Sequence, residues 1–276
     1  MQTQSLNATG AILDRVDLQL HSLRSDGAWS AEVLGSALVA AGIGYAALTE
    51  HDWLTPQDEL EALERRAGCR MVPGVEVTCF AAGRYVDLLC YGASAQAPAL
   101  DALNGQLWER QLANTRQVRE AIPVLRTLSD LEALTTAQMP HRLRDGLGSE
   151  FGGSGEKLRV LKAHGYRLQA HGLADVVAAC RADGWVCLIA HPGAEKTGHP
   201  ALSVSEVLEL TSGYRIDGLE VFSPAHGLTQ EQKFADFCEA QGLLVAAGSD
   251  SHGAADGLGH WRAETCAALL RRVGRL

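Results

Sequence analysis

The stretch VDLQLHSLRSDG at residues 16–27 joins an apolar segment to a polar turn. Its first half has the length and apolar character of a buried strand. That strand ends on His21, and the turn after it carries Asp26. Later strand-like segments lead in the same way into His51, His191, Asp250 and His252. The chain therefore places polar side chains repeatedly at the ends of its predicted strands.

Apolar runs of strand length alternate with segments of helical period over most of the chain. Residues 31–41 form a predicted helix that Ser30 opens and Gly42 closes. Further helix starts are predicted at Thr55, at Ser203 with Glu206 in a capping box, and at Thr229 with Gln232. Alternating strands and helices predict an α/β fold with parallel strands and right-handed crossovers. Both a barrel and an open sheet fit this pattern.

The alternation of predicted strands and helices stops between residues 97 and 184. This region is helix-like and contains a glycine-rich stretch, DGLGSEFGGSGEK, at residues 145–157, which is typical of a flexible loop. We expect a barrel whose first part spans residues 1–96 and whose second part spans 185–276. A helical insertion or cap at 97–184 would separate them.

The composition of the chain argues against some classes of function. The 276 residues carry a formal net charge of -9, which argues against broad capture of nucleic acid or anionic membranes. Neither a membrane-spanning run nor a signal-peptide pattern is present, so we expect a cytoplasmic protein that does not engage a membrane. The seven cysteines lack a C-x-x-C pair and are predicted to be reduced core residues.

Ligands gather at the carboxyl ends of strands in alternating α/β folds, because the connecting loops converge there. Four histidines and several carboxylates follow strands in this chain. Imidazole and carboxylate together are the ligand set of divalent ions such as Mn, Fe and Zn. The sequence therefore predicts a divalent metal site at one end of the fold.

Five short sequence motifs contain the candidate ligands in a characteristic order. In order they read D-L-Q-L-H-S-L-R-S-D-G, T-E-H-D, G-V-E, A-H-P-G and G-S-D-S-H-G. This series resembles the signature motifs of the PHP (polymerase and histidinol phosphatase) family and spans residues 17–253. The resemblance implies a distorted (β/α)7 barrel that holds up to three divalent ions. The interruption by a helical insertion resembles the subgroup of metal-dependent phosphoesterases that act on nucleotides and short RNA.

The resemblance also implies roles for individual residues. The implied metal ligands are His21, Asp26, His51, Glu76, His191, Asp250 and His252. Asp26, Glu76 and His191 are expected to act in catalysis, and Asp17 as a supporting residue of the strand. The remaining histidines are expected at the surface or in caps: His164, His171, His199, His226 and His260.

Two positions depart from the family pattern. Gln19 stands where the first motif usually has histidine, and Asp87 stands where histidine is usual after G-V-E. Both are counted as candidate ligands, and both shift the site from nitrogen toward oxygen donors. We therefore expect two or three ions, with Mn preferred and Fe, Zn or Mg as alternatives. A decayed site, in which Gln19 and Asp87 no longer serve a metal, is the competing interpretation.

The predicted activity is hydrolysis of a phosphate monoester through in-line attack by metal-bound hydroxide. The expected substrate is a nucleotide or another small phosphorylated metabolite, with a short oligonucleotide as a further option. Arg142 and Arg144 in the insertion are the candidate substrate-binding residues. Two alternatives stay open: hydrolysis of a bond other than a phosphate ester, and a non-catalytic domain that binds metal or ligand. The oligomeric state is left open.

Overall fold

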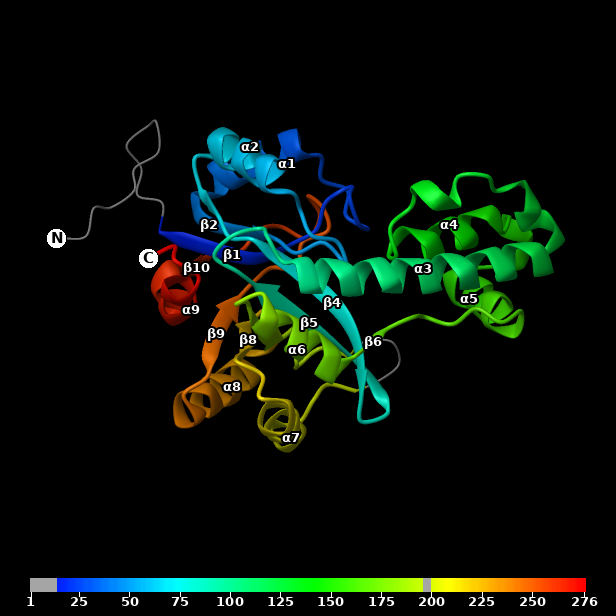
Figure 1. Cartoon of the computed structure of the whole chain (residues 1–276). Helices are drawn as coiled ribbons and strands as arrows, with labels where there is room; N and C mark the ends of the chain where they lie inside the picture. The colour runs from blue at the N-terminus through cyan, green and yellow to red at the C-terminus, as the bar shows by residue number, and fades with distance from the viewer. Residues whose placement is uncertain (1–13, 196–199) are drawn as a thin grey trace.

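The computed structural model describes residues 14–195 and 200–276, so His199 lies outside the described residues. Strands and helices alternate along most of the chain (Figure 1). The strands are β1 (Arg15–Leu20), β2 (Ile43–Leu48), β3 (Arg70–Met71), β4 (Gly74–Ala81), β5 (Arg84–Tyr91), β6 (His171–Gly172), β7 (Val186–Ile189), β8 (Gly218–Phe222), β9 (Leu244–Ala247) and β10 (Trp261–Arg262). The α-helices are α1 (Ala31–Ala41), α2 (Gln57–Ala67), α3 (Pro98–Ala121), α4 (Gln138–Gly146), α5 (Ser154–Ala163), α6 (Leu173–Ala182), α7 (Val204–Tyr214), α8 (Leu228–Gln241) and α9 (Ala267–Arg272).

The described strands form two sheets, so the fold is mixed α/β. One sheet has the order β10-β1-β2-β3 and the other β6-β4-β5-β7-β8-β9. Neighbours β1 and β2 are parallel, as are β7, β8 and β9, but β5 runs antiparallel to both β4 and β7. The strand β5, which no helix separates from β4, thus interrupts the parallel arrangement of the strand-and-helix units. Ala82 and Gly83 both have positive φ, and this two-residue turn folds β4 and β5 into a hairpin.

Contacts at two points join the sheets. Single parallel bridges link Leu20 to Ser251 and His51 to Glu76. The phenol of Tyr91 on β5 donates a 2.7 Å hydrogen bond to the carbonyl of Leu18 on β1. Buried side chains of β1, β2, β5, β7 and β9 form one apolar cluster together with α9. The two sheets therefore share this apolar cluster.

Helices cover the outer faces of the sheets. The pair α1 and α2 packs beside β1 and β2 through an apolar cluster that includes Leu34, Leu38, Leu60 and Leu63. Helices α6, α7 and α8 lie along the larger sheet (Figure 1) and share a second cluster with its strands. Ser30 caps α1 and Gly42 ends it with a φ of 68°, as predicted.

Helix α3 reaches from the sheets to a separate helical lobe (Figure 1). Near its start, Leu100 belongs to the core of the larger sheet. Farther along, Leu112 and Val118 pack with Leu143 of α4 and Leu161 of α5 in a core of their own. The glycine-rich stretch is not a continuous loop, because it includes the end of α4, a short 3-10 turn and the start of α5. Packing against α3 outweighs the low helix propensity of its glycines.

All seven cysteines lie within the described residues, are buried, and form no disulfide. The prediction of reduced core thiols is confirmed. Among the helices of the described residues, none is both long enough and apolar enough to cross a bilayer.

Candidate metal centre

The predicted metal-binding residues meet at one end of the two sheets. His21 directly follows β1, and His51 follows β2. His191 follows β7, while Asp250 comes after β9. The bridges between Leu20 and Ser251 and between His51 and Glu76 lie at the same end. Segments far apart in the sequence therefore deliver imidazoles and carboxylates to one place.

One cluster is rich in nitrogen. It consists of His21, Asp26, His51 and His252, whose ligand atoms all lie within 4.8 Å of one another. Asp26 Oδ1 is 3.9 Å from His21 Nδ1 and 3.4 Å from His252 Nε2. Asp26 Oδ2 is 3.8 Å from His51 Nε2. A carboxylate thus faces three imidazoles at the distances expected around one shared cation.

Two further clusters contain more oxygen and share Glu76. His21, Glu76 and Asp250 form one of them, with His21 Nε2 3.1 Å from Glu76 Oε2 and 3.2 Å from Asp250 Oδ1. Glu76, Asp87 and His191 form the other, with His191 Nε2 2.9 Å from Glu76 Oε1. Glu76 is fully buried and offers one oxygen to each cluster. Its position is that of a carboxylate between two neighbouring cation sites.

The imidazole nitrogens and carboxylate oxygens of the clusters are arranged as ligands of a bound cation. Within the described residues, the buried ring nitrogens of His21 and Oδ1 of Asp26 make no hydrogen bond of regular geometry, although His21 Nε2 lies between the carboxylates of Glu76 and Asp250. Buried polar atoms normally have a hydrogen-bond partner, so each atom of this kind needs an explanation. His21 is fully buried and packs between the rings of His51 and His252, at centroid distances of 4.6 and 4.3 Å. Buried imidazole and carboxylate donors that converge in this way are what divalent ions bind.

The two departures from the family pattern differ in their placement. Asp87 lies in the cluster with Glu76 and His191. Gln19 is fully buried, and its amide nitrogen donates a 3.0 Å hydrogen bond to Glu76 Oε2. Its amide oxygen has no hydrogen-bond partner among the described residues. The side chain of Gln19 therefore orients the central carboxylate directly.

Charges within the centre stabilise one another. Burial opposes ionisation of Glu76, but His51, His191 and His21 outweigh it and hold the pKa of Glu76 well below its ordinary value. Burial likewise opposes ionisation of Asp26, yet the neighbouring imidazoles lower the pKa of that carboxyl. Asp250 and Glu76 overcome the burial of His21 and raise its pKa. Both carboxyls are therefore ionised, as cation ligands must be.

A ring of buried polar side chains holds the loops of the centre. Glu50 accepts hydrogen bonds from Ser22 and Ser25, which lie in the turn that carries Asp26. Asp17 accepts hydrogen bonds from the backbone nitrogen and hydroxyl of Ser249, next to Asp250. These carboxylates contact backbone and hydroxyl donors, so they fix the positions of the candidate ligands.

The segment after β7 has similar support from β8. Glu220 accepts a 2.8 Å hydrogen bond from the His191 backbone nitrogen, and burial raises the pKa of Glu220 to about 8. His226 is buried, with Nδ1 2.7 Å from the Val221 carbonyl and Nε2 accepting from Gly193 at 2.9 Å. The prediction of a surface or capping role is therefore wrong for His226.

The other remaining histidines divide between core and surface. His171 on β6 is buried, which contradicts its predicted surface position, because β6 pairs with β4 under the helical lobe. His164 and His260 are exposed, as predicted.

Backbone strain is concentrated at the same end of the fold. Asp52, His191 and Asp250 have φ values of 52°, 27° and 54°, in a region that non-glycine residues seldom adopt. Each residue comes just after a strand and lies in or beside the clusters. Strained conformations of this kind accumulate where function fixes the geometry.

A cavity of about 280 Å³ opens beside the clusters. Asp26, His51 and Asp87 line one side, and the helical lobe contributes His141 and Gln111 to the other. His141 is a basic group of the insertion beside the candidates Arg142 and Arg144, and its place at the cavity depends on how α4 lies over the sheets. The lobe therefore forms part of the wall of the site.

The predicted substrate-binding arginines occupy different surroundings. Arg142 makes two 3.1 Å contacts through Nε with the carboxylate of Asp130 and lies at the surface of the lobe. Arg144 is close enough to His141 to reinforce the effect of burial, which lowers the pKa of that imidazole. The charge of Arg144 therefore acts on a residue that lines the cavity, whereas Arg142 is paired with Asp130.

No protein-family model matches the chain. It is 29% identical over 254 residues to a phosphoribosyl 1,2-cyclic phosphate 1,2-diphosphodiesterase of Eggerthella lenta, which covers 86% of this chain and 94% of the relative. It is 27% identical over 254 residues to a 3',5'-nucleoside bisphosphate phosphatase of Chromobacterium violaceum, with 88% of each chain covered. A Bifidobacterium adolescentis structure, provisionally named a metal-dependent phosphoesterase, superposes with a TM-score of 0.75 at 20% identity and covers 93% of this chain and 96% of its own.

These similarities agree with the residues of the centre. The relatives align over most of the chain, across both sheets and the helical lobe. The structural neighbour has the same fold. In its ordered motifs and in these relatives, the chain is similar to metal-dependent phosphoesterases of the PHP type.

Proposed function

We propose that the protein hydrolyses a phosphate monoester of a nucleotide or of another small phosphorylated metabolite. The observation that carries this proposal is the placement of Glu76, whose two oxygens lie 3.1 Å from His21 and 2.9 Å from His191. A carboxylate between two cation sites is the arrangement expected of a multinuclear phosphoesterase. The names of the two relatives, a cyclic phosphate diphosphodiesterase and a nucleoside bisphosphate phosphatase, support the same substrate class.

The side chains that would hold the ions are His21, Asp26, His51, Glu76, Asp87, His191, Asp250 and His252. Divalent ions would supply Lewis acidity and stabilise the charge that develops on the phosphoryl group. Among the protein groups, Asp26 and Glu76 would fix the spacing of the sites, and His191 would complete the site next to Asp87. Gln19 would keep the carboxylate of Glu76 in position by donating to Oε2.

Manganese is our proposal for the metal. Two of the clusters contain two carboxylates and one imidazole, and the third contains one carboxylate and three imidazoles. Mixed oxygen and nitrogen donors without thiolate suit Mn, whereas Zn in proteins favours nitrogen and sulfur. Two or three ions would fit these clusters, with Fe, Zn and Mg as alternatives.

We propose that seven strands form a distorted barrel around the shared core: β1, β2, β4, β5, β7, β8 and β9. The bridges from Leu20 to Ser251 and from His51 to Glu76 support this interpretation, because they join β1 to the segment after β9 and the segment after β2 to β4. The proposed division stays 1–96 and 185–276 for the barrel and 97–184 for the insertion. The separate core of the lobe supports it, although Leu100 and Leu173 pack against the larger sheet.

The free cysteines support a cytoplasmic location.

The lobe would bind the part of the substrate away from the scissile bond. His141 lines the cavity, and Arg144 lies near it, so these two residues are the favoured cationic contacts for a second phosphate. Arg142 would contribute only after leaving Asp130. A short oligonucleotide would need to enter between the lobe and the sheets.

The test is phosphate release from a panel of nucleoside monophosphates and bisphosphates and small sugar phosphates in added Mn. We expect turnover that His191→Ala abolishes and that His164→Ala, a change at an exposed histidine of α5's end, leaves unaltered. Metal binding without release of phosphate from any compound would contradict the proposal. It would favour hydrolysis of another bond or a non-catalytic binding domain.

A further inference from the structure

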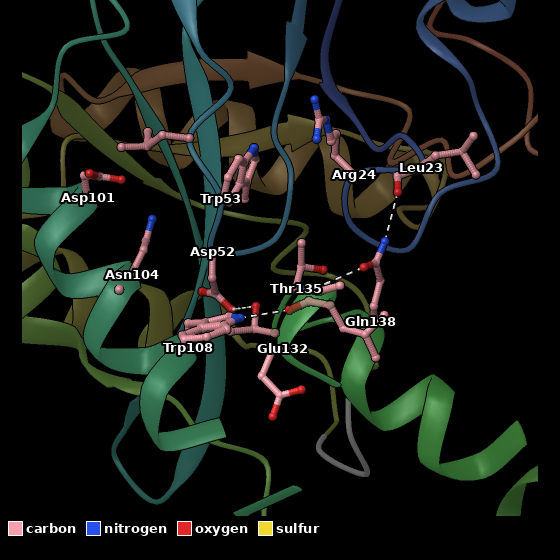
Figure 2. Close-up of a pocket in the computed structure, with 15 residues that line it drawn as sticks. Leu23, Arg24, Asp52, Trp53, Asp101, Asn104, Trp108, Glu132, Thr135 and Gln138 are labelled. Atoms are coloured by element: carbon pink, nitrogen blue, oxygen red, sulfur yellow. Dashed lines mark hydrogen bonds between the residues drawn. The ribbon is translucent and has the colours of Figure 1, made fainter. Parts of the chain in front are cut away.

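A second, larger pocket adjoins the candidate metal centre (Figure 2). Its volume is about 560 Å³, within the range of small-molecule sites. Loops after β1 and β2 contribute Leu23 and Trp53, and the helical lobe contributes residues of α3 and of the segment before α4. Asp52 and Thr136 line both this pocket and the cavity beside the metal clusters. A molecule that extends from the centre would therefore reach this pocket past Asp52.

One face of α3 forms a wall of the pocket. Asp101, Asn104, Gly105 and Trp108 recur at the spacing of a single helical face, and Figure 2 shows the labelled members of this series along one side. Asn104 is 4% exposed, yet neither its amide nitrogen nor its amide oxygen has a hydrogen-bond partner among the described residues. The hydroxyl of Thr135 in the same pocket is also buried without a partner. Buried amides without partners destabilise a fold, so this position suits a ligand better than it suits the core.

Gly105, next to Asn104 on this face of α3, is also unexpected in a helix. It lies within the 24-residue helix α3, where glycine is among the poorest helix formers. A Cβ added at this position would meet nothing within 4 Å. Packing within the chain therefore does not require glycine here. Glycine does keep the surface of the pocket flat beside Asn104.

The rest of the lining is aromatic and acidic. Trp53 is 40% exposed, and the Trp108 ring is held by a 2.8 Å hydrogen bond from Nε1 to the Leu134 carbonyl. The charged residues of the lining are three acids and one arginine: Asp52, Asp101, Glu132 and Arg24. Arg24 is already paired with Glu59 at 2.7 Å. Such a lining disfavours a phosphate and favours a flat, uncharged ring with polar edges.

We infer that this pocket is a nucleobase subsite and that Asn104 is its specificity-determining residue. A side-chain amide offers a donor and an acceptor side by side, which matches the paired acceptor and donor on the edge of a base such as adenine. Trp53 and Trp108 supply aromatic surface for the ring, and Gly105 leaves room for it. The inference rests on the proposed phosphoesterase function for the link to the metal centre, and it narrows the substrate class to nucleotides.

The test measures binding of adenosine, guanosine, cytidine and uridine to the Mn-loaded full chain by titration calorimetry, without any turnover. The variants are Asn104→Leu, which keeps the branched shape but removes the amide, and Gly105→Ala. Gly155→Ala is the matched control, because Gly155 lies in α5, outside the pocket, and its added Cβ also meets nothing within 4 Å. Melting temperatures are recorded for all variants.

We expect at least one nucleoside to bind the unaltered protein, and Asn104→Leu to weaken that binding about tenfold through the lost hydrogen bonds. Gly105→Ala should also weaken binding, although its melting temperature should equal or exceed that of the unaltered protein. Gly155→Ala should bind like the unaltered protein. Binding of no nucleoside, or equal binding to all variants, would overturn the inference, as would a fall in melting temperature for Asn104→Leu with binding unchanged.

A kinetic comparison separates this inference from the proposed function. The ratio of kcat/KM for the preferred nucleoside 5'-monophosphate to that for ribose 5-phosphate should fall about tenfold in Asn104→Leu. Turnover of ribose 5-phosphate without nucleoside binding would overturn the subsite and leave the phosphoesterase intact. Nucleoside binding without hydrolysis of any phosphate ester would overturn the proposed function and leave the subsite in place.

Discussion

The carboxylate of Glu50 gives a sharp test of how the metal centre is held together. It is fully buried and accepts hydrogen bonds from the backbone nitrogen of Ser22, at 3.1 Å, and from the hydroxyls of Ser22 and Ser25. A hydrogen bond contributes about 0.5–1.5 kcal/mol, and a buried donor left without its partner costs about 1–3 kcal/mol. The two hydroxyls can turn to other acceptors in a Glu50→Ala variant, but the backbone nitrogen cannot. We therefore expect a loss of about 3 kcal/mol in the free energy of unfolding.

The turn that Glu50 holds carries Asp26, so the same change should weaken metal binding. Removal of a residue that positions ligands typically lowers metal affinity by about 10–100-fold. We expect that loss in Mn titrations of Glu50→Ala, with the number of ions bound at saturation unchanged. Unfolding in urea supplies the stability, and Glu61→Ala on the exposed side of α2 is the reference. An unfolding free energy within about 1 kcal/mol of that reference would show that Glu50 does not hold this turn.

Three further changes test other parts of the structure. Tyr91→Phe removes the hydrogen bond to the Leu18 carbonyl and should lower the free energy of unfolding in urea by about 1 kcal/mol. Burial and the nearby Arg110 lower the pKa of His171 to about 4. The unfolded chain therefore takes up a proton at this histidine more readily than the folded protein does. The free energy of unfolding is at its full value above pH 6.5 and falls as the pH falls toward 4. The unaltered protein should lose about 2 kcal/mol relative to His171→Gln over that range, after screening by solvent, and parallel pH profiles would contradict this. Gly193→Ala would place a Cβ 2.6 Å from the His226 ring, so kcat/KM should fall about tenfold with helix content unchanged in circular dichroism.

Local patterns predicted much of the fold. The capping box of Ser203 and Glu206 is present at the start of α7, and each predicted strand end delivers its polar residue. Two helix starts were misplaced. Pro56 occupies the N-cap of α2 in place of Thr55, and Gly227 with Gln230 opens α8 two residues before Thr229 and Gln232. Several residues near each start satisfy the same capping rule, and tertiary contacts decide among them.

The site was predictable where a strand leads directly into a ligand. Asp87 lies in the middle of β5, and only the hairpin with β4 brings it beside Glu76 and His191. The pocket of Asn104 could not be found from the sequence, because it forms between α3 and loops about 50 to 80 residues earlier in the chain. Its signals, a buried amide without a partner and a glycine within a helix, become visible only once the packing is known.

The metal content of the protein purified without chelator shows whether Glu76 is shared between two cation sites. The unaltered chain should hold two or three divalent ions, and Glu76→Gln should hold fewer, because the two oxygens of Glu76 serve two of the clusters. Exposed Glu61→Gln should retain the full content. An unaltered chain without bound metal, or a Glu76→Gln variant with undiminished content, would contradict the account of Glu76 as the shared ligand of a multinuclear centre.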